Sequence, residues 1–377
     1  MILTNLKLVN FRNYSKIDIK LNKKMNILIG NNGVGKTNIL ESIIILSLTK
    51  SFRTREDLNL IKIGEKKAKI IAKSKDKTIP KSLEVDIWEN HKQLFINNNE
   101  VKKISDYISN LNVIVFTPDD LNIIKGSPSI RRNLLNVELS QLSKIYLNTY
   151  NEYNKILRTR NEYLKLLYTN SIADTKYLDV LTDKLIEKAT KIYISRKEYI
   201  DKINDSINTI FSKISNKGTL RVEYLPNIEF DKYDEESIGK TMKKKYKDNY
   251  FKEINNKMTL YGPHRDDLNF YLNDQNLKLF GSQGEQRLSI IAYKIAEIGI
   301  FESITNTKPV LLFDDIFSEL DIRKRNKLLN LIGSDIQSII TTTDLKNINK
   351  KYIEEASVFE IKKDNIIKKA GIKWKKN

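Results

Sequence analysis

The chain has 377 residues, 40% of them hydrophobic, so it is long enough for more than one folded domain and too apolar for a disordered chain. It contains no cysteine and two histidines, which excludes disulfides, thiolate nucleophiles and cysteine-based zinc sites. Lysine and arginine number 66 against 47 acidic residues, and the net charge of +19 favours a polyanionic partner such as nucleic acid, although an even spread of lysine over the surface is the alternative.

The first third of the chain predicts strands, a glycine-rich loop and a helix. Apolar residues alternate in residues 3–11 and 17–21 and continue in residues 25–29, which predicts three strands. From Ile39 the apolar residues are dense enough for a helix that is buried on most sides. No apolar run approaches the length of a membrane span and no signal peptide precedes the first strand, so we expect a cytoplasmic protein.

The middle of the chain predicts long helices. Apolar residues recur at steps of three and four in residues 131–168 and again in residues 178–214, with a polar break between the two segments. The simplest structure is an antiparallel helical hairpin that forms an arm of roughly 50 to 60 Å at 1.5 Å per residue. Two helices of an ordinary bundle are the alternative.

The last third returns to a mixed pattern. "TLRVEYLP" predicts a strand and residues 268–280 a hairpin, whereas residues 232–257 form a charged segment for which a helix and a mobile stretch are both open. Helical periodicity resumes at Gly284, and the apolar runs "KPVLLFDD" and "IQSIITTTD" predict buried parallel strands.

A glycine-rich segment joins the third predicted strand to the helix that follows it. Gly30, Gly35, Lys36 and Thr37 match G-x-x-x-x-G-K-[ST], the pattern of a phosphate-binding loop. Its backbone N–H groups and the helix N-terminus attract phosphate, Lys36 adds a positive charge, and the Thr37 hydroxyl can bind Mg²⁺. We therefore predict a nucleotide-binding segment that comprises Gly30, Asn31, Asn32, Gly33, Val34, Gly35, Lys36, Thr37 and Asn38.

Two aspartates end the apolar run at residues 310–315. A carboxylate at the end of a buried strand beside a phosphate loop can hold Mg²⁺, the role predicted for Asp314. Asp315 is predicted to orient the attacking water and take its proton, and with Lys36 these two residues form the predicted catalytic set. An acidic pair at a helix N-terminus is the alternative.

A second polar segment, "GSQGEQR" at residues 281–287, precedes a predicted helix. Ser282 and Gly284 place a hydroxyl and N–H groups at the helix start, where an anion can bind. A serine that only caps its helix is the alternative, and this segment alone favours it.

Together these motifs resemble ABC-type ATPases. Residues 30–37 resemble Walker A, residues 310–315 Walker B, residues 318–321 the D-loop and residues 282–286 the signature motif. Their order and the helical insertion between them resemble the branch of SMC, Rad50 and RecN heads, and the blocks "NFRNY", "SFRT", "VFTPDDLNIIKGSPSIRR" and "TLYGPHRDDL" are similar to the RecF family.

This resemblance implies an α/β ABC-type P-loop ATPase head that is split in sequence by an inserted helical-hairpin arm. Residues 1–130 would form the N-terminal lobe, residues 131–257 the arm and residues 258–377 the C-terminal lobe. ATP and Mg²⁺ held by one copy would be capped by Ser282 and Gly284 of a second copy, which gives an ATP-dependent homodimer. Arg12 would lie near the nucleotide and Asp119 near the position of a Q-loop.

Some residues depart from the wider ABC pattern. Asp315 stands where many ABC ATPases have glutamate, and Glu285 stands where glutamine is common. The switch histidine of transporters is absent, and Thr342 or Thr343 occupies its place. Slow hydrolysis is therefore expected.

The resemblance implies ATP-dependent DNA binding in recombinational repair and replication. Such a protein is a weak DNA-dependent ATPase that binds duplex and gapped DNA without sequence preference, works with RecR and RecO, and helps to load the RecA recombinase. Lysines 243–245 and the tail at residues 368–377 are candidate DNA contacts, and solvated charged faces are the alternative for each.

Two other functions share the phosphate loop. The soluble ATPase subunit of an ABC transporter predicts a switch histidine, a compact helical subdomain and a balanced charge, none of which the sequence indicates. A metabolic P-loop kinase leaves residues 281–287 unexplained.

Overall fold

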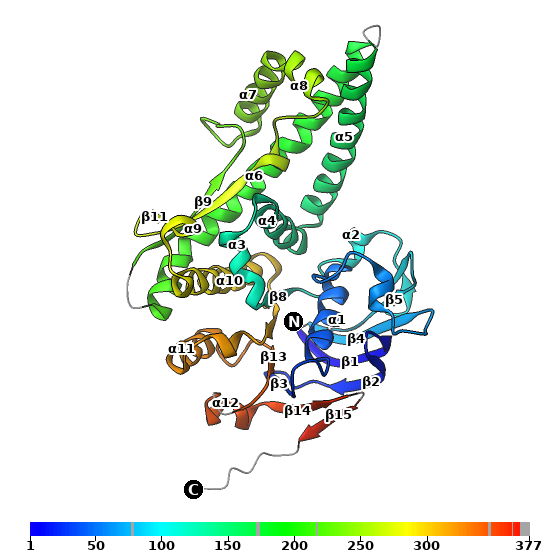
Figure 1. The fold of residues 1–377 in the computed structure, drawn as a ribbon, viewed down its shortest axis with the longest axis vertical. Helices are drawn as coiled ribbons and strands as arrows, with labels where there is room; N and C mark the ends of the chain where they lie inside the picture. The colour runs from blue at the N-terminus through cyan, green and yellow to red at the C-terminus, as the bar shows by residue number, and fades with distance from the viewer. Residues whose placement is uncertain (77–78, 171–173, 216–217, 346–347, 364, 370–377) are drawn as a thin grey trace. The chain divides into compact units, whose positions relative to one another are not determined.

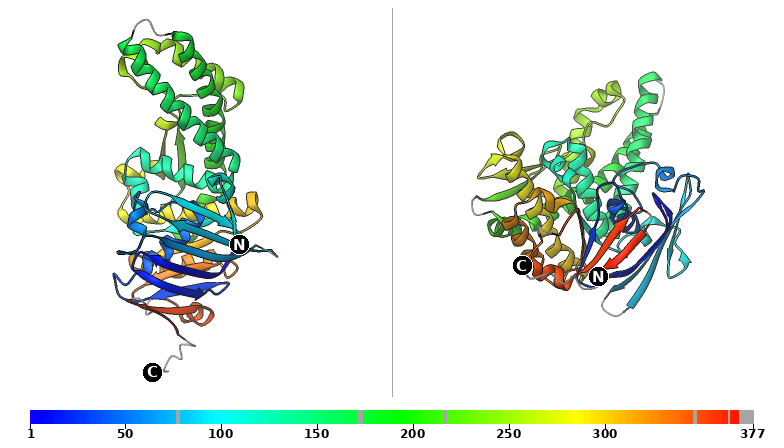
Figure 2. Two further views of the ribbon diagram at one scale, coloured as in Figure 1. Left: turned by 90° about the vertical axis from the view of Figure 1, so that its right-hand side faces the viewer. Right: turned by 60° about the horizontal axis from the view of Figure 1, so that its bottom comes forward.

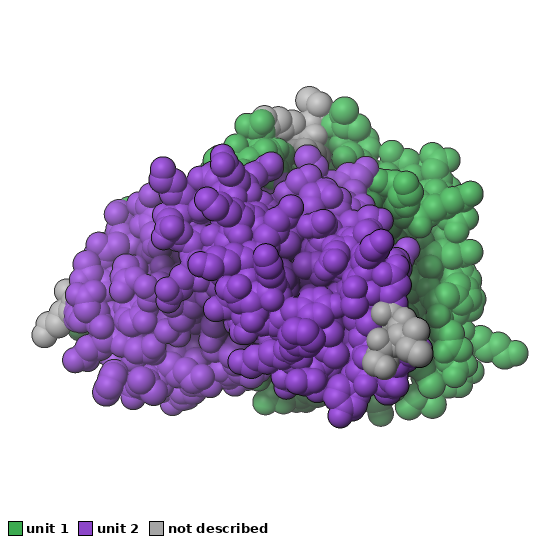
Figure 3. All heavy atoms as spheres, turned by 90° about the horizontal axis from the view of Figure 1, so that it is seen from above, with its two compact units in different colours: residues 1–120, 213–216, 291–377 green, residues 121–212, 217–290 purple. Residues whose placement is uncertain are grey.

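The chain folds into two compact units, neither of which is continuous in sequence. Unit 1 comprises residues 1–120, 213–216 and 291–377, and unit 2 comprises residues 121–212 and 217–290 (Figure 3). The computed structural model describes residues 1–76, 79–170, 174–215, 218–345, 348–363 and 365–369.

The borders of the two units differ from those of the predicted lobes and arm. Residues 121–130 and 258–290, which the sequence assigned to the two lobes, belong to unit 2. The division into an N-terminal lobe, an arm and a C-terminal lobe stays a prediction.

Unit 1 contains two six-stranded sheets (Figure 1). The first is antiparallel, with the order β2-β1-β4-β5-β6-β7, and its strands are β1 (Ile2–Phe11), β2 (Tyr14–Lys20), β4 (Ala68–Asp76), β5 (Ile79–Ile87), β6 (Lys92–Ile96) and β7 (Asn99–Glu100). The second is parallel except for β15, with the order β15-β14-β3-β13-β12-β8, and its strands are β3 (Met25–Ile29), β8 (Val113–Phe116), β12 (Val310–Asp314), β13 (Ser338–Thr342), β14 (Ser357–Lys362) and β15 (Asn365–Lys369). The three strands predicted before the loop and the two predicted after residue 308 are confirmed.

The core of unit 1 forms around α1 (Lys36–Leu48). All residues from Ile39 to Ser47 of this helix are buried, as the dense apolar pattern predicted. Ile43 shares one apolar cluster with Leu8 of the antiparallel sheet and Leu312 of the parallel sheet. The helix therefore joins both sheets into one core, and the same packing fixes the position of its N-terminus. The other α-helices of unit 1 among the described residues are α2 (Ile104–Tyr107), α11 (Ile322–Ile332), α12 (Lys350–Glu355) and, from residue 291 onward, the second part of α10 (Gln283–Thr305).

Unit 2 is mainly helical. Its helices are α3 (Asn122–Lys125), α4 (Pro128–Leu142), α5 (Lys144–Thr169), α6 (Thr175–Ile214), α7 (Glu235–Asp248), α8 (Tyr250–Asn256), α9 (Leu277–Phe280) and the first part of α10 (Gln283–Thr305). A three-stranded sheet contains β9 (Leu220–Leu225), β10 (Asp267–Leu272) and β11 (Gln275–Asn276). The hairpin predicted at residues 268–280 is present, but the chain after Asn276 forms α9 instead of extending the second strand. Among the described helices, none combines the length and the apolar character that a bilayer span requires.

Helices α5 and α6 form the predicted antiparallel hairpin (Figures 1 and 2). Three contacts show that the two helices are antiparallel, because later residues of α5 contact earlier residues of α6. These contacts are the ion pair of Glu152 with Lys188 (3.0 Å), the bond from Arg160 Nε to Thr182 Oγ1 (2.9 Å), and the ring contact of Tyr163 with Tyr177. At 1.5 Å per residue the 40 residues of α6 span about 60 Å.

The prediction of one continuous helix over residues 131–168 is wrong. The chain leaves the helical conformation at Ser143, which has φ −141° and ψ 112°, and its Oγ accepts a bond from the N–H of Tyr146. Ser143 is therefore the N-cap of α5, and α4 is a separate helix. The apolar spacing continues across the break, so periodicity alone does not reveal it.

Buried ion pairs fasten the hairpin to the rest of unit 2. Arg196 of α6 pairs with Asp266 at 2.7 Å, both side chains are 1% exposed, and Tyr224 donates a further bond to the same carboxylate. Arg160 of α5 pairs with Glu253 of α8 at 2.6 Å. Removing one member of such a pair leaves a buried charge without a partner, at a cost of roughly 3 to 5 kcal/mol.

His264 makes the free energy of unfolding of unit 2 depend on pH. Its Nε2 lies 3.2 Å from the carbonyl oxygen of Thr259, so Nε2 donates there, and Nδ1 accepts from the Tyr153 hydroxyl at 2.6 Å. Burial lowers the pKa of His264 from 6.5 to about 4. The folded chain therefore keeps the imidazole neutral at pH values where the unfolded chain protonates it.

We predict that the free energy of unfolding falls by about 3 kcal/mol between pH 6.5 and pH 4 because of this residue alone. The contribution is complete above pH 6.5 and is lost as the pH decreases toward 4. Urea unfolding at pH 7.5 and pH 4.5 measures it, and His264→Asn should weaken the pH dependence. His91→Asn, at an exposed position, is the control, and an equal change in both variants would contradict the assignment.

Candidate nucleotide-binding site

The predicted phosphate loop connects β3 to α1 and requires glycine at two positions. Gly35 precedes α1 with φ +107°, and a Cβ there would lie 2.7 Å from the side chains of Asn13 and Tyr14. A Cβ on Gly30 would lie 2.5 Å from the carbonyl oxygen of Ile361. Residues 31–33 between them are exposed, so their backbone N–H groups are accessible to a ligand.

Lys36 is folded back over this loop. Its Nζ donates to the carbonyl oxygens of Gly30 (2.7 Å) and Asn31 (2.9 Å), and the residue is buried. Burial lowers the pKa of the Lys36 ammonium, and the carboxylates of Asp315 and Asp314 offset part of this effect. The ammonium is therefore held at the loop, in electrostatic contact with both predicted acids.

The parallel sheet brings Asp314 to the loop. Strand β13 lies between β3 and β12, and their carboxyl ends meet at one edge, where such sheets bind ligands. At this edge the Thr37 hydroxyl donates to Asp314 Oδ1 at 3.0 Å. A hydroxyl and a carboxylate side by side are oxygen ligands of the kind that Mg²⁺ uses beside a phosphate group.

Asp315 has an unusual backbone. Its φ is +50°, in the left-handed region, and its N–H donates to Thr341 Oγ1 at 2.9 Å. Burial raises the pKa of the Asp315 carboxyl, the Lys36 ammonium opposes this effect, and Asp314 adds to it. A carboxylate with a raised pKa binds a proton more readily than an ordinary aspartate, which suits a general base.

Thr341 is a site residue that the sequence analysis missed. It is fully buried, accepts from the Asp315 N–H, and donates to Asp314 Oδ1 at 2.9 Å. Its strand neighbour in β12 is Asp314, so the pairing of β12 with β13 would have indicated it. Within "TTTD" nothing distinguishes it from Thr342, whose hydroxyl donates to the Asp344 carbonyl at 2.8 Å, or from the exposed Thr343. Replacement of the switch histidine by either of these stays a prediction.

Arg12 lies in the turn between β1 and β2. Its guanidinium donates two bonds to the fully buried Glu41 of α1, at 2.6 and 2.9 Å, and a third to the Asn59 carbonyl. Arg53 lies on the same carboxylate at 3.5 Å and donates to Asn38 at 2.8 Å. Glu41 was missed by the sequence analysis, and proximity of Arg12 to a nucleotide stays a prediction.

The neighbour of Arg12 contacts the loop directly. Asn13 Nδ2 donates to the Val34 carbonyl at 3.2 Å, and Asn13 Oδ1 accepts from Asn38 Nδ2 at 2.7 Å. The β1–β2 turn is therefore part of the loop's support. By contrast, the Asp119 side chain is exposed, while Asp120 pairs with Lys294 at 2.6 Å.

Ser282 begins α10 in unit 2 and caps that helix. Its Oγ and its N–H both donate to Glu285 Oε2, at 2.7 and 2.8 Å, and the Glu285 N–H lies 3.3 Å from Ser282 Oγ. This reciprocal arrangement is a capping box, and it lowers the pKa of Glu285 through the two bonds from Ser282. An added Cβ on Gly284 would meet nothing within 4 Å. A contact of Ser282 or Gly284 with nucleotide stays a prediction.

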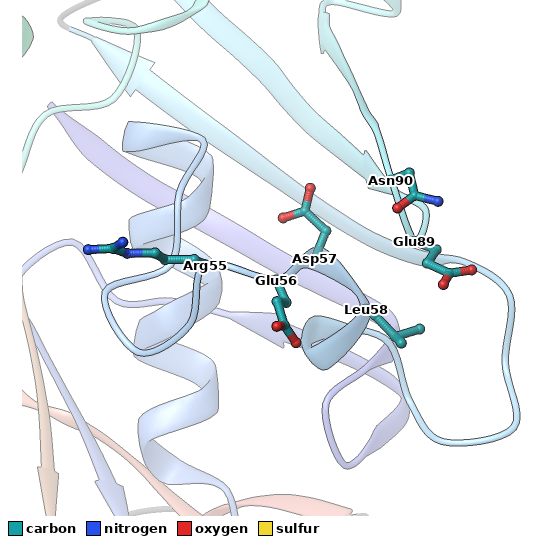
Figure 4. A pocket seen from close by; sticks show the side chains of 6 residues that line it. All are labelled: Arg55, Glu56, Asp57, Leu58, Glu89 and Asn90. Atoms are coloured by element: carbon teal, nitrogen blue, oxygen red, sulfur yellow. The ribbon is translucent and has the colours of Figure 1, made fainter.

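Unit 1 also has a pocket of about 410 Å³ that is lined by residues 55–58, 89 and 90 and not by the phosphate loop (Figure 4). Three of its lining residues are acidic, which disfavours phosphate, and one of them, Asp57, pairs with Lys92 at 2.5 Å. None of the predicted nucleotide-binding residues lines it. The lining residues are Arg55, Glu56, Asp57, Leu58, Glu89 and Asn90.

Thr341→Val should destabilise unit 1 by about 1 to 3 kcal/mol, because it removes a buried hydroxyl and leaves the Asp315 N–H and an Asp314 oxygen without that partner. Thr341→Ser keeps the hydroxyl and should restore most of the loss. Denaturant unfolding of the three proteins measures the difference, and equal midpoints for the valine and wild-type chains would show that these bonds contribute nothing.

Comparisons with known proteins cover nearly the whole chain. The profile of the RecF/RecN/SMC N-terminal domain family matches residues 2–367. The chain is 40% identical over 364 residues to the DNA replication and repair protein RecF of Limosilactobacillus reuteri, covering 96% of this chain and 97% of that protein. It is 38% identical over 369 residues to the RecF of a Geobacillus strain, covering 97% and 98%.

Solved structures of RecF and of an Smc head are also similar to this chain. The recombination mediator protein RecF with ATP, of the RecFOR pathway, matches with a TM-score of 0.90 and 30% identity and covers 98% of both chains. The Smc head of Pyrococcus furiosus matches with a TM-score of 0.56 at 15% identity, covering 98% of this chain and 96% of that one, and shares the fold. The predicted ABC-type head is confirmed and a transporter subunit is not favoured. The chain belongs to the RecF family, within the larger group of RecF, RecN and SMC heads.

Proposed function

We propose that this protein is an ATP-dependent DNA-binding ATPase of recombinational repair and replication. The main support is the arrangement of Lys36, Thr37 and Asp314 at one sheet edge, in a chain that is similar to RecF proteins over nearly its whole length. The bond from Thr37 to Asp314 at 3.0 Å is the observation that carries the proposal, because it joins the phosphate loop to the carboxylate that this chemistry needs.

In the proposed mechanism the backbone of residues 30–38 binds the phosphates of ATP and Lys36 contributes its charge. Thr37 and Asp314 hold Mg²⁺, which supplies positive charge to the phosphate oxygens. Asp315 orients the attacking water and accepts its proton, in keeping with its raised pKa.

A second copy completes the site. Ser282 and Gly284 of that copy cap the terminal phosphate, so ATP joins two chains into a homodimer. The Ser282 hydroxyl and N–H both bond to Glu285, so this carboxylate competes with phosphate for the same donors. Weak binding and slow hydrolysis are expected from this competition.

The proposed partners follow from the relatives' names and from the charge. The relatives are named as DNA replication and repair proteins, and one solved relative is titled as part of the RecFOR pathway. With a net charge of +19, we expect sequence-independent binding to duplex and gapped DNA, a hydrolysis rate that responds to DNA, and cooperation with RecR, RecO and RecA in the cytoplasm.

The test of the dimer is light scattering of the full chain with and without ATP and Mg²⁺. Wild type should double in mass with ATP. Two variants should stay monomeric: Lys36→Ala, because it loses the positive charge that binds phosphate, and Ser282→Arg, because the larger side chain obstructs the composite site. Ser212→Arg, at an exposed serine on α6, is the matched control and should dimerise like wild type. A wild-type chain that stays monomeric at saturating ATP would overturn the proposal.

Asp315→Asn should lower the rate of ATP hydrolysis at least 100-fold, while ATP-dependent dimerisation remains. Asparagine has the same shape and tolerates the left-handed backbone, so the loss reports the missing proton acceptor. In wild type the raised pKa of Asp315 should shift the acidic limb of the rate–pH profile above that of an ordinary aspartate. Phosphate release measured across pH tests both points, and hydrolysis by the variant at the wild-type rate would exclude Asp315 as the base.

A further inference from the structure

The outward face of the antiparallel sheet in unit 1 carries a cluster of lysines. In the strand register, Lys20 and Lys73 lie on either side of Asn5, and Lys16 and Lys69 lie on either side of Val9. Alternate residues of β1, such as Leu6 and Leu8, are fully buried, so these rows belong to the opposite face. We call the following residues the lysine face: Lys7, Lys16, Lys20, Lys73 and Lys75.

These five lysines have one acidic residue beside them, Asp18, which lies between Lys16 and Lys20 on β2 and is the register partner of Lys7. The carboxylates of β5 are engaged elsewhere, because Glu84 pairs with Lys69 at 2.5 Å and Asp86 pairs with Lys67 at 2.6 Å. The one acid within the rows, Asp18, accepts from Asn5 at 2.6 Å. Among the side chains that the structure describes, none of the five lysines has a carboxylate within ion-pair distance.

A lysine-rich composition does not account for this face. The three-stranded sheet of unit 2 has a charged outer face too, but there Arg221 lies 3.7 Å from Glu223 on the same strand. Lysines on an edge strand such as β2 protect it from pairing with another chain, whereas β1 and β4 are interior strands. Like charges on one sheet face repel each other, so this arrangement costs stability unless an anion binds.

We propose that the lysine face is a docking surface for the sugar–phosphate backbone of duplex DNA, an inference that rests on the proposed function. Lys16 and Lys20 are four residues apart, about 13 Å along the strand, and β2 and β4 are about 10 Å apart. Such a patch matches the backbone of about four base pairs at 3.4 Å each. In the left view of Figure 2 the blue strands of this sheet face the viewer with no helix in front of them.

The same hairpin that carries three of these lysines contacts the phosphate loop. Lys7 and Lys16 flank the β1–β2 turn, in which Asn13 bonds to Val34 and Asn38. A change in the loop on nucleotide binding therefore acts on strands that form the lysine face. This contact gives a physical route by which ATP and DNA affect each other's binding.

The experiment measures the affinity of the full chain for a fluorescent duplex at several salt concentrations, with ATP present. A variant with Gln at Lys16, Lys20, Lys73 and Lys75 should lower the slope of log affinity against log salt by about 3.6, because four phosphate contacts are lost at roughly 0.9 each. Its affinity at low salt should fall at least about tenfold. Arginine at the same positions should keep the wild-type slope.

The matched control places Gln at four exposed lysines of α6, α7 and α8, Lys184, Lys240, Lys247 and Lys252, which removes the same charge. The control should keep most of the wild-type slope, and the lysine-face variant should keep ATP-dependent dimerisation and its melting temperature. Equal slopes for the lysine-face variant and wild type would overturn this inference alone. A wild-type chain that fails to bind the duplex would overturn the proposed function together with it.

Discussion

The parallel register of three neighbouring strands is the constraint on which the site depends. Because β3, β13 and β12 run in the same direction, the start of the phosphate loop, Thr341 and Asp314 reach one edge together, although more than 270 residues separate Thr37 from Asp314. Helix α1 is fixed by its packing against both sheets, and its position brings Lys36 and Thr37 to the same edge. The chemistry of the site thus follows from sheet order, which long-range pairing establishes.

Buried charges have a related role away from this edge. Glu41 holds Arg12 and Arg53 against α1, and Asp266 and Glu253 hold the two long helices of unit 2 through Arg196 and Arg160. Ion pairs of this kind add little net stability compared with apolar packing, but they tolerate only one arrangement of their partners. Each pair therefore favours the helix position at which the buried charge keeps its partner, because any other position would leave that charge unpaired.

Much of the fold and the centre of the site could be predicted from local sequence. The alternation in residues 3–11, the loop at residues 30–37 and the run before Asp314 each carry their signal within a few residues. The break at Ser143 was missed because the apolar spacing of α4 continues in α5. Thr341 and Glu41 were missed because their roles depend on strand pairing and on contacts from other segments, which no local pattern contains. The borders of the units are likewise a property of long-range contacts.

The left-handed backbone at Asp315 restricts how this site can evolve. Short polar side chains adopt such a conformation readily, because they bond to nearby backbone groups, whereas longer side chains meet a steric penalty of about 1 kcal/mol or more. Ser318 also bonds to the Asp315 carbonyl, at 2.7 Å, so the turn is shaped by more than one residue. Exchange of this aspartate for the longer acid would therefore cost about 1 kcal/mol or more as long as the turn keeps its left-handed residue, and a change elsewhere in the turn that relaxed this conformation would remove the cost.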